Sequence, residues 1–254
     1  MRIAVCAAGF SQGTYSAALK SKPSFRKSSS MTIMAFDAIL DAGLVEPNLR
    51  PLLDESAFIV GSSYGEIENT REFLKTWSNS GLARPLLFQS SLHNGTLGFL
   101  ALELGMMGPS FTVSHFHLTG EKSLSFALDL LSQDAVSGTI KSCLVVCADW
   151  MAPDFLPAFQ MLHPQDRLWR NSAAAVLLTQ EERAIEFGIK PLAYLDSLNL
   201  SHSNSGVLSG DYSDSDALYR WVQQVRDPSD FFGKTALTLD KPDQTQTQIV
   251  WSRT

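Results

Sequence analysis

The sequence predicts an α/β fold in which a sheet is covered by helices on both faces. Five apolar runs of strand length carry this prediction. Several are near-continuous in Val, Ile, Leu and Ala, which is typical of strands buried on both faces. The runs are Ile3–Ala7, Ala57–Gly61, Phe111–Phe116, Cys143–Ala148 and Ala173–Leu178. Helical patterns alternate with them, and that alternation indicates a layered α/β architecture.

Four segments between these runs repeat apolar residues at the spacing of one helix face. They are Met31–Ala42, Phe73–Trp77, Leu97–Leu104 and Leu124–Leu131. A glycine follows each of the first three within a few residues, as expected where a helix ends. The fourth segment is apolar almost all round, which predicts a buried helix.

The pattern loosens beyond Glu182. Leu192–Leu198 suggests one more strand, and Leu218–Val225 forms an amphipathic stripe that begins after Asp214 and Asp216, as helices often do. Residues 241–254 are polar and are expected to be poorly ordered. We therefore expect a single domain over residues 1–240, followed by a polar tail over 241–254.

The composition excludes several classes of function. The chain has 254 residues, of which 44% are hydrophobic and 18% charged, as in ordinary globular proteins. A net charge of −6 argues against nucleic-acid binding, which needs a basic face. No apolar run reaches eighteen residues, so membrane insertion is not expected. The apolar stretch at the N-terminus is shorter than that of a signal peptide, and a buried first strand fits it better.

The three cysteines are expected to be buried free thiols. None belongs to a Cys-x-x-Cys pair, and Cys6, Cys143 and Cys147 all lie in strand-like runs without a nearby basic residue. This usage indicates a reducing cytoplasm. No motif points to a cofactor, because Ser62–Gly65 lacks a phosphate-loop lysine and no Gly-x-Ser-x-Gly elbow surrounds Ser114.

The most informative stretch runs from residue 89 to residue 120. It contains Ser91-Leu92-His93-Asn94 before a helix, the pair Gly108-Pro109, the strand Thr112-Val113-Ser114, and a turn through Thr119-Gly120 into the buried helix. A side chain in this strand-to-helix turn would stand at the positive end of the helix. A cysteine placed there would be held as its thiolate.

This ordered set resembles the N-terminal half of β-ketoacyl synthases, which have the thiolase fold. In that family a Gly-Pro pair and a Thr-Val-Ser-like strand precede a nucleophilic Cys that lies three residues before a Gly. Gly108, Pro109 and Gly120 match, and His117 stands at the position of the Cys. Ser91, His93 and Asn94 are similar to the chain-length-factor-like branch, whose members also lack the Cys.

The resemblance implies one thiolase-type half fold: a mixed five-stranded sheet with helices on both faces and a buried central helix. It also implies a non-catalytic, chain-length-factor-like subunit of a type II ketosynthase heterodimer, with aryl polyene biosynthesis as the expected context. The partner would be a full-length β-ketoacyl synthase, which this chain would stabilise while helping to shape the acyl tunnel. Acyl-carrier protein would be an indirect partner. A half fold is further expected to leave apolar surface bare.

The resemblance places the partner interface on Phe111, Thr112, Val113 and Ser114. In the fold that the chain resembles, this strand lies at the sheet edge and pairs antiparallel with its counterpart across a two-fold axis. The local chemistry agrees, because none of the four residues is charged and no Lys, Pro or bulge guards the strand. An interior strand of a monomer would be equally uncharged, so that alternative stays open.

Two other functions stay open. A stand-alone enzyme would use His117 as a base or, with His115, as a metal ligand, and His93, His163 or an acid elsewhere in the chain would have to complete the ligand set. A packed or hydrogen-bonded His117 at a vestigial site is the preferred interpretation, and His93 with Asn94 is expected to make structural hydrogen bonds at a helix start. A carrier-protein-binding module would use the basic cluster of residues 20–27, which a solvated loop also explains.

Overall fold

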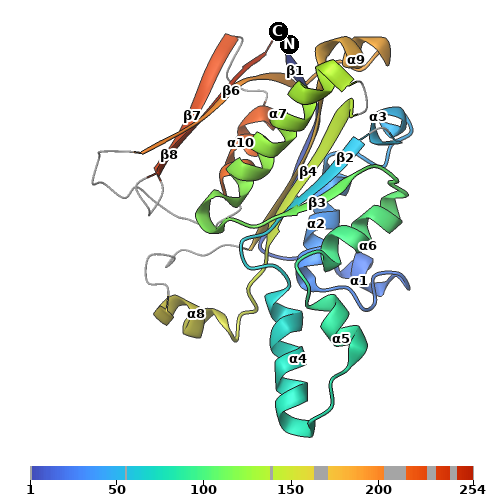
Figure 1. Cartoon of the computed structure of the whole chain (residues 1–254), viewed down its shortest axis with the longest axis vertical. Helices are drawn as coiled ribbons and strands as arrows, with labels where there is room; N and C mark the ends of the chain where they lie inside the picture. Colours follow the sequence, from blue (N-terminus) through green and yellow to red (C-terminus); the bar gives the residue numbers. More distant parts are fainter. Residues whose placement is uncertain are drawn as a thin grey trace.

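The computed structural model describes residues 2–54, 56–137, 140–162, 171–202, 216–227, 233–240 and 245–253. The described strands form one sheet of eight, in the order β3-β2-β4-β5-β1-β6-β8-β7, with helices on both faces (Figure 1). The predicted α/β class is confirmed, and the sheet has eight strands rather than five. The strands are β1 (Ile3–Gln12), β2 (Ser56–Gly61), β3 (Ser110–Val113), β4 (Ser142–Asp149), β5 (Ser172–Gln180), β6 (Ala193–His202), β7 (Gly233–Asp240) and β8 (Thr245–Arg253).

The five apolar runs of the sequence became β1 to β5, which lie next to one another as β3-β2-β4-β5-β1. β2 is parallel to β3 and β4, whereas β5 is antiparallel to β4 and β1, so the sheet is mixed. β2 and β4 are buried along their whole length. Their near-continuous apolar sequences reflect cover on both faces.

Three further strands extend the sheet beyond β1. β6 pairs with the first residues of β1, and β8 lies between β6 and β7. Residues 245–253 are therefore an ordered strand, and the expectation of a poorly ordered tail there was wrong. Thr247, Ile249 and Trp251 are buried in alternation with more exposed neighbours, including Gln248. This period of two is that of a strand, but its polar composition hid it.

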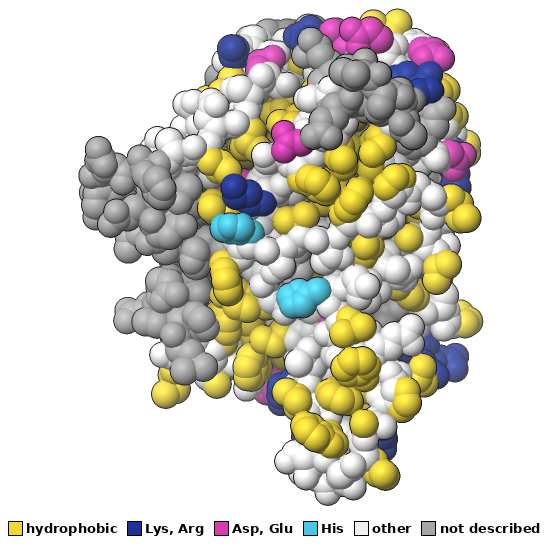
Figure 2. All heavy atoms as spheres, viewed as in Figure 1, with side chains coloured by type: hydrophobic (Ala, Val, Ile, Leu, Met, Phe, Trp, Pro, Cys, Tyr) yellow, Lys and Arg dark blue, Asp and Glu magenta, His cyan; other side chains and the backbone are white. Residues whose placement is uncertain are grey.

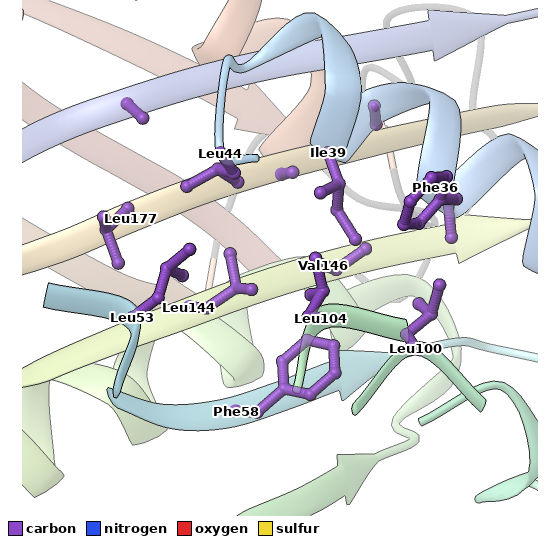
Figure 3. Packing of buried hydrophobic residues seen from close by; sticks show 14 of the residues in the cluster. Phe36, Ile39, Leu44, Leu53, Phe58, Leu100, Leu104, Leu144, Val146 and Leu177 are labelled. Carbon is purple, nitrogen blue, oxygen red and sulfur yellow. The ribbon is translucent and has the colours of Figure 1, made fainter. Parts of the chain in front are cut away.

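One face of the sheet is covered by α2 (Ser30–Asp41) together with four shorter helices. These are α1 (Ala17–Ser21), α3 (Arg50–Asp54), α6 (Gly95–Leu104) and α9 (Glu181–Glu186). Figure 3 shows Ile39 of α2 directed at Val146 of the sheet, and Phe36 of α2 belongs to the same core cluster. α2 approaches β1 so closely that a Cβ on Gly9 would lie 2.2 Å from the backbone nitrogen of Ala42.

The other face is covered by α7 (Thr119–Ser137) and α10 (Asp216–Arg226), which pack against each other. α7 lies on β2 and β4, and it buries Leu124, Ala127 and Leu131 as predicted. α10 lies on β1 and β5 and buries Trp221 and Val222 completely. Part of the apolar surface that a half fold was expected to leave bare is thus covered by the chain's own C-terminal helix.

An arm made of α4 (Ile67–Ser80) and α5 (Pro85–Ser90) projects from the body, and α8 (Leu156–Leu162) lies near its base (Figure 1). The helix predicted around Phe73–Trp77 is present and ends at Gly81, but no residue of α4 is buried. Its apolar stripe contacts α5, where Phe73 packs against Phe88. Among the described helices, none has the length and apolar character needed to cross a membrane.

Candidate functional site

The candidate site lies at the edge strand β3 and the turn that follows it. Gly108 precedes β3 and passes so close to β2 that a Cβ there would lie 2.2 Å from the Ser56 carbonyl oxygen. Pro109 accepts a hydrogen bond from the Phe58 backbone N–H at 2.8 Å. The chain therefore packs directly against β2 at Gly108 and Pro109, just before β3 begins.

β3 ends the sheet, and among the described strands it pairs only with β2. Phe111, Thr112 and Val113 are half-buried, and Ser114, just beyond the strand, is exposed. The Phe111 ring packs edge-on against Phe126 of α7, with centroids 5.0 Å apart. The strand thus has the edge position that an interface strand needs, and its use as an interface stays a prediction.

The turn after β3 differs from the expected one. The sequence suggested a strand up to Phe116 and a tight turn at Thr119-Gly120, but the strand ends at Val113. A short 3₁₀ turn, η1 (Phe116–Leu118), leads into α7, and Thr119 and the buried Gly120 already belong to that helix. His115 and His117 therefore do not share a strand face, because the backbone leaves the extended conformation between them.

Phe116 is the strained residue of this turn. Its φ is +42°, and it is the one non-glycine residue with positive φ in the described part of the chain. Bulky residues rarely adopt this conformation. The residue is 63% exposed. The backbone of His117 follows within η1, and the side chain of His117 lies outside what the structure describes.

A buried hydrogen-bond network holds the turn. Asp149, at the end of β4, is 1% exposed and accepts hydrogen bonds from the Ser62 hydroxyl (2.9 Å) and the Ser63 backbone N–H (2.8 Å). The Ser63 hydroxyl lies 3.2 Å from Asp149 Oδ2 and 3.0 Å from the Phe116 carbonyl oxygen. The Thr119 hydroxyl accepts from the His115 N–H and donates to the same Phe116 oxygen, both at 2.9 Å.

None of the three cysteines lies in the turn after β3. Cys6, Cys143 and Cys147 are all free and buried, as predicted. Burial raises the pKa of Cys6 and of Cys147 to about 12, so both stay protonated at neutral pH. A protonated, inaccessible thiol is a poor nucleophile.

The motif residues Ser91, His93 and Asn94 lie near the loop after β2, which also contacts the turn after β3. The Ser91 hydroxyl donates to the Phe88 carbonyl at the end of α5 (2.7 Å). The His93 ring covers Gly65, where an added Cβ would lie 2.6 Å from Nδ1. Asn94 is the N-cap residue of α6; its side chain makes no capping hydrogen bond, and its carbonyl oxygen accepts from the Gly98 N–H at 3.0 Å.

The loop between β2 and α4, residues 62–66, connects the two parts of the site. Its Ser63 holds the turn after β3, and its Gly65 receives the His93 ring. The two motif stretches, distant in sequence, therefore meet on one loop. Gly65 has a φ of +60°, a conformation that suits glycine.

Three buried acids, Asp149, Glu66 and Glu121, belong to no motif of the sequence and were not predicted. Glu66 is 3% exposed, and its Oε1 accepts from the hydroxyls of Ser29 (2.9 Å), Thr32 (3.1 Å) and Thr96. Asn69 donates to Oε2 at 3.0 Å. Burial raises the pKa of Glu66, and the hydroxyl hydrogen bonds oppose that shift. For Asp149 and Glu66 the available signal in the sequence was position, since the first ends a buried strand and the second closely follows one, where a carboxylate would need partners.

A metal site receives no support from the described side chains. Within the described ranges, no three His, Cys, Asp or Glu side chains come together as a metal-binding group. His163, one of the candidate ligands, lies outside the described residues.

Apolar side chains gather on the face that carries the site. Figure 2 shows them over the region of α7 and β3, and again over the projecting arm. Phe126, Leu128 and Leu130 of α7 are only partly buried. The exposed apolar residues of the arm and its flanks are Leu74, Trp77, Leu82, Leu86, Phe88 and Leu92. Patches of this kind usually mark a surface that another protein covers.

Comparison with known proteins gives a consistent fold. No protein-family model and no curated protein sequence matches the chain. A solved structure of a type II polyketide acyl-carrier protein in complex with its ketosynthase is similar, with a TM-score of 0.76, 13% identity and 99% of each chain covered. A ketosynthase in complex with its chain length factor from Xenorhabdus doucetiae gives a TM-score of 0.63, 16% identity and full coverage of both chains.

A third similar structure is a β-ketoacyl synthase from Burkholderia phymatum, with a TM-score of 0.69, 10% identity, and coverage of 100% of this chain and 99% of that chain. At such low identity these likenesses show the fold alone. The chain therefore has the thiolase-like fold of ketosynthases, as the motif order indicated.

Proposed function

We propose that this chain is a non-catalytic, chain-length-factor-like subunit that pairs with a full-length β-ketoacyl synthase of a type II system. The observation that carries the proposal is a nucleophile-type turn that lacks a cysteine and follows an open, uncharged sheet edge. Aryl polyene biosynthesis in a reducing cytoplasm is the context we propose, and the three buried free thiols agree with it.

The chemistry of the turn supports the lack of catalysis. Condensation by a ketosynthase needs a thiolate that takes up the acyl chain. Here His117 occupies that position, and the thiols of Cys6 and Cys147 are protonated and buried. An acyl-imidazole would be too reactive to retain a growing chain.

The open edge supports a protein partner. Free edges of sheets are normally guarded by charge, proline or a bulge, and residues 111–114 carry none of these. Pairing with a second strand would satisfy the free backbone groups of β3. It would also bring the partly exposed side of α7 and the apolar arm toward the partner.

The proposed partner is the full-length ketosynthase, and acyl-carrier protein would reach the complex through it. The basic cluster of residues 20–27 is poorly suited to bind an acidic carrier protein directly. Lys20, Arg26 and Lys27 line a cavity of about 400 Å³ together with Glu68 and Glu72, so the cavity is mixed in charge. An acidic carrier protein would prefer a uniformly basic surface.

Two measurements test the proposal. The purified chain, given carrier-bound malonyl and acyl groups, should form no elongated product, whereas its complex with the ketosynthase of its own gene neighbourhood should do so. Amide hydrogen exchange of residues 111–114 should be much slower in that complex than in the free chain. Product from the chain alone would contradict the lack of catalysis, and equal exchange in both states would place the interface elsewhere.

A further inference from the structure

Phe116 combines two features that each cost stability. Its backbone has positive φ, and the residue is 63% exposed. Strained conformations persist only where their surroundings impose them, and they concentrate at sites of function. A large aromatic ring in water is likewise unfavourable for the isolated chain.

The strained backbone by itself does not explain the phenylalanine. Glycine adopts positive φ at little cost, and the other positive-φ residues in the described ranges are all glycines, among them Gly43, Gly65 and Gly105. A glycine at 116 would therefore fit the same turn with less strain. The residue at this position is better explained by its ring than by its backbone.

The surroundings hold the backbone that carries the ring. The Phe116 carbonyl oxygen lies 3.0 Å from the Ser63 hydroxyl and 2.9 Å from the Thr119 hydroxyl. Ser63 is in turn held by Asp149, which is buried at the end of β4. A buried carboxylate, two hydroxyls and a helix start thus hold this turn in place. The side chain is presented by a rigid support and not by a flexible loop.

The position of Phe116 suggests what the ring contacts. It follows β3, the open edge of the sheet, by three residues and precedes α7, the helix over which apolar side chains gather (Figures 1 and 2). A strand that pairs along β3 would bring the partner's surface directly to this turn. Rigidly held aromatic residues are frequent binding hot spots, because little conformational entropy is lost when they bind.

We propose that Phe116 is an anchor residue for the ketosynthase partner, and that its ring enters an apolar recess of that protein when the β3 edge is paired. This inference rests on the proposed function and adds to it a specificity-determining residue. Ser63, Thr119 and Asp149 are then positioning residues, which act by aiming the ring.

The test compares variants of the full chain for their affinity to the full-length ketosynthase of the same gene neighbourhood. Phe116→Gly should weaken binding by about tenfold or more, as expected for an anchor, while the free chain should melt at a higher temperature. Phe116→Tyr, which keeps the ring, should bind within a few fold of wild type. Ile185→Ala in α9 removes an equally exposed apolar side chain away from β3 and should change nothing.

The decisive result is that Phe116→Gly lowers the affinity for the ketosynthase while it raises the melting temperature of the free chain. Replacing a residue that only supports the fold would lower stability and affinity together. If wild type binds with residues 111–114 protected from exchange, but Phe116→Gly binds equally well, this inference is overturned and the proposed function stands. If wild type forms no complex with the ketosynthase, both are overturned.

Discussion

The Ser63 hydroxyl lies 3.0 Å from the carbonyl oxygen of Phe116, and this contact joins two stretches that are 53 residues apart. Ser63 follows β2, and Phe116 follows β3, so the contact closes the ends of two neighbouring parallel strands. Through this contact the β2–α4 loop stabilises the turn between β3 and α7. The contact also gives a direct way to loosen that turn.

Replacing Ser63 with Ala should destabilise the free chain by about 1–3 kcal/mol, because Asp149 and the Phe116 carbonyl would each lose a buried hydrogen-bond partner. Urea unfolding measures the loss, and amide exchange at residues 115–119 should become faster. Ser132→Ala is the matched control, since the Ser132 hydroxyl contacts only its own helix at an exposed position. Equal effects of the two variants on stability would show that the Ser63 hydroxyl does not stabilise the turn.

Glu66 should make the chain less stable as pH rises. Its folded-state pKa lies above the ordinary 4.5, so the folded state holds the proton more tightly than the unfolded state. Its effect is flat below pH 4.5, stability falls between that pH and the raised pKa, and the effect is flat again above it. Glu66→Gln keeps an acceptor oxygen for the three hydroxyls and should remove this fall.

The measurement is the free energy of unfolding of wild type and Glu66→Gln between pH 4 and pH 8, compared as a difference at each pH. Glu103→Gln, at an exposed position of α6, serves as the control and should leave the wild-type profile unchanged. A difference between wild type and Glu66→Gln that does not vary with pH would show that the buried carboxylate titrates normally.

Trp251→Ala in β8 should cost about 3–5 kcal/mol, because it removes a large buried side chain. Gln248→Ala, on the exposed side of the same strand, should cost well under 1 kcal/mol. Thermal melting of both variants measures the difference. Equal melting temperatures would mean that the C-terminal strand contributes little to the core.

Gly108→Ala should be strongly destabilising, because the new Cβ would lie 2.2 Å from the Ser56 carbonyl oxygen and would push β3 away from β2. Gly98→Ala in α6 is the opposite case: nothing lies within 4 Å of its Cβ, and alanine stabilises a helix by about 1 kcal/mol relative to glycine. Chemical denaturation should show a lower free energy of unfolding for Gly108→Ala and a higher one for Gly98→Ala. A tolerated Gly108→Ala would mean that this strand pair adjusts easily.

His117→Ala should leave the condensing activity of the assembled heterodimer largely intact, because the proposed function gives this position no chemical role. The measurement is the turnover of carrier-bound substrates by the complex, with Ile185→Ala as the control. A hundredfold loss would correspond to about 2.7 kcal/mol of transition-state stabilisation, too much for a bystander.

Local signals predicted the first five strands and several helices well. β2, β4 and β5 have near-continuous apolar sequences because helices cover both faces, and such runs are visible without any knowledge of their neighbours. The amphipathic stripe of α10 was equally clear, and Leu218, Trp221, Val222 and Val225 are all buried. β8 was missed because its alternation uses threonine and glutamine on a half-buried surface.

The candidate site was predicted in part. The sequence placed β3 before a strand-to-helix turn, and the assignment of His117 to the nucleophile position, which rests on the resemblance, stays a prediction. It could not show that the strained residue is Phe116, because backbone torsion depends on contacts from Ser63 and Thr119. Nor could it show that His93 covers Gly65, a contact made across the β2–α4 loop.

The sequence by itself determined the layered α/β class and the buried thiols, because composition and periodicity are properties of neighbouring residues. Only the tertiary structure decided that β3 is the open edge, that Asp149 supports the turn, and that α10 and β8 complete the sheet and its cover. These depend on which segments meet in space, and strand order and long-range hydrogen bonds leave no local pattern to read.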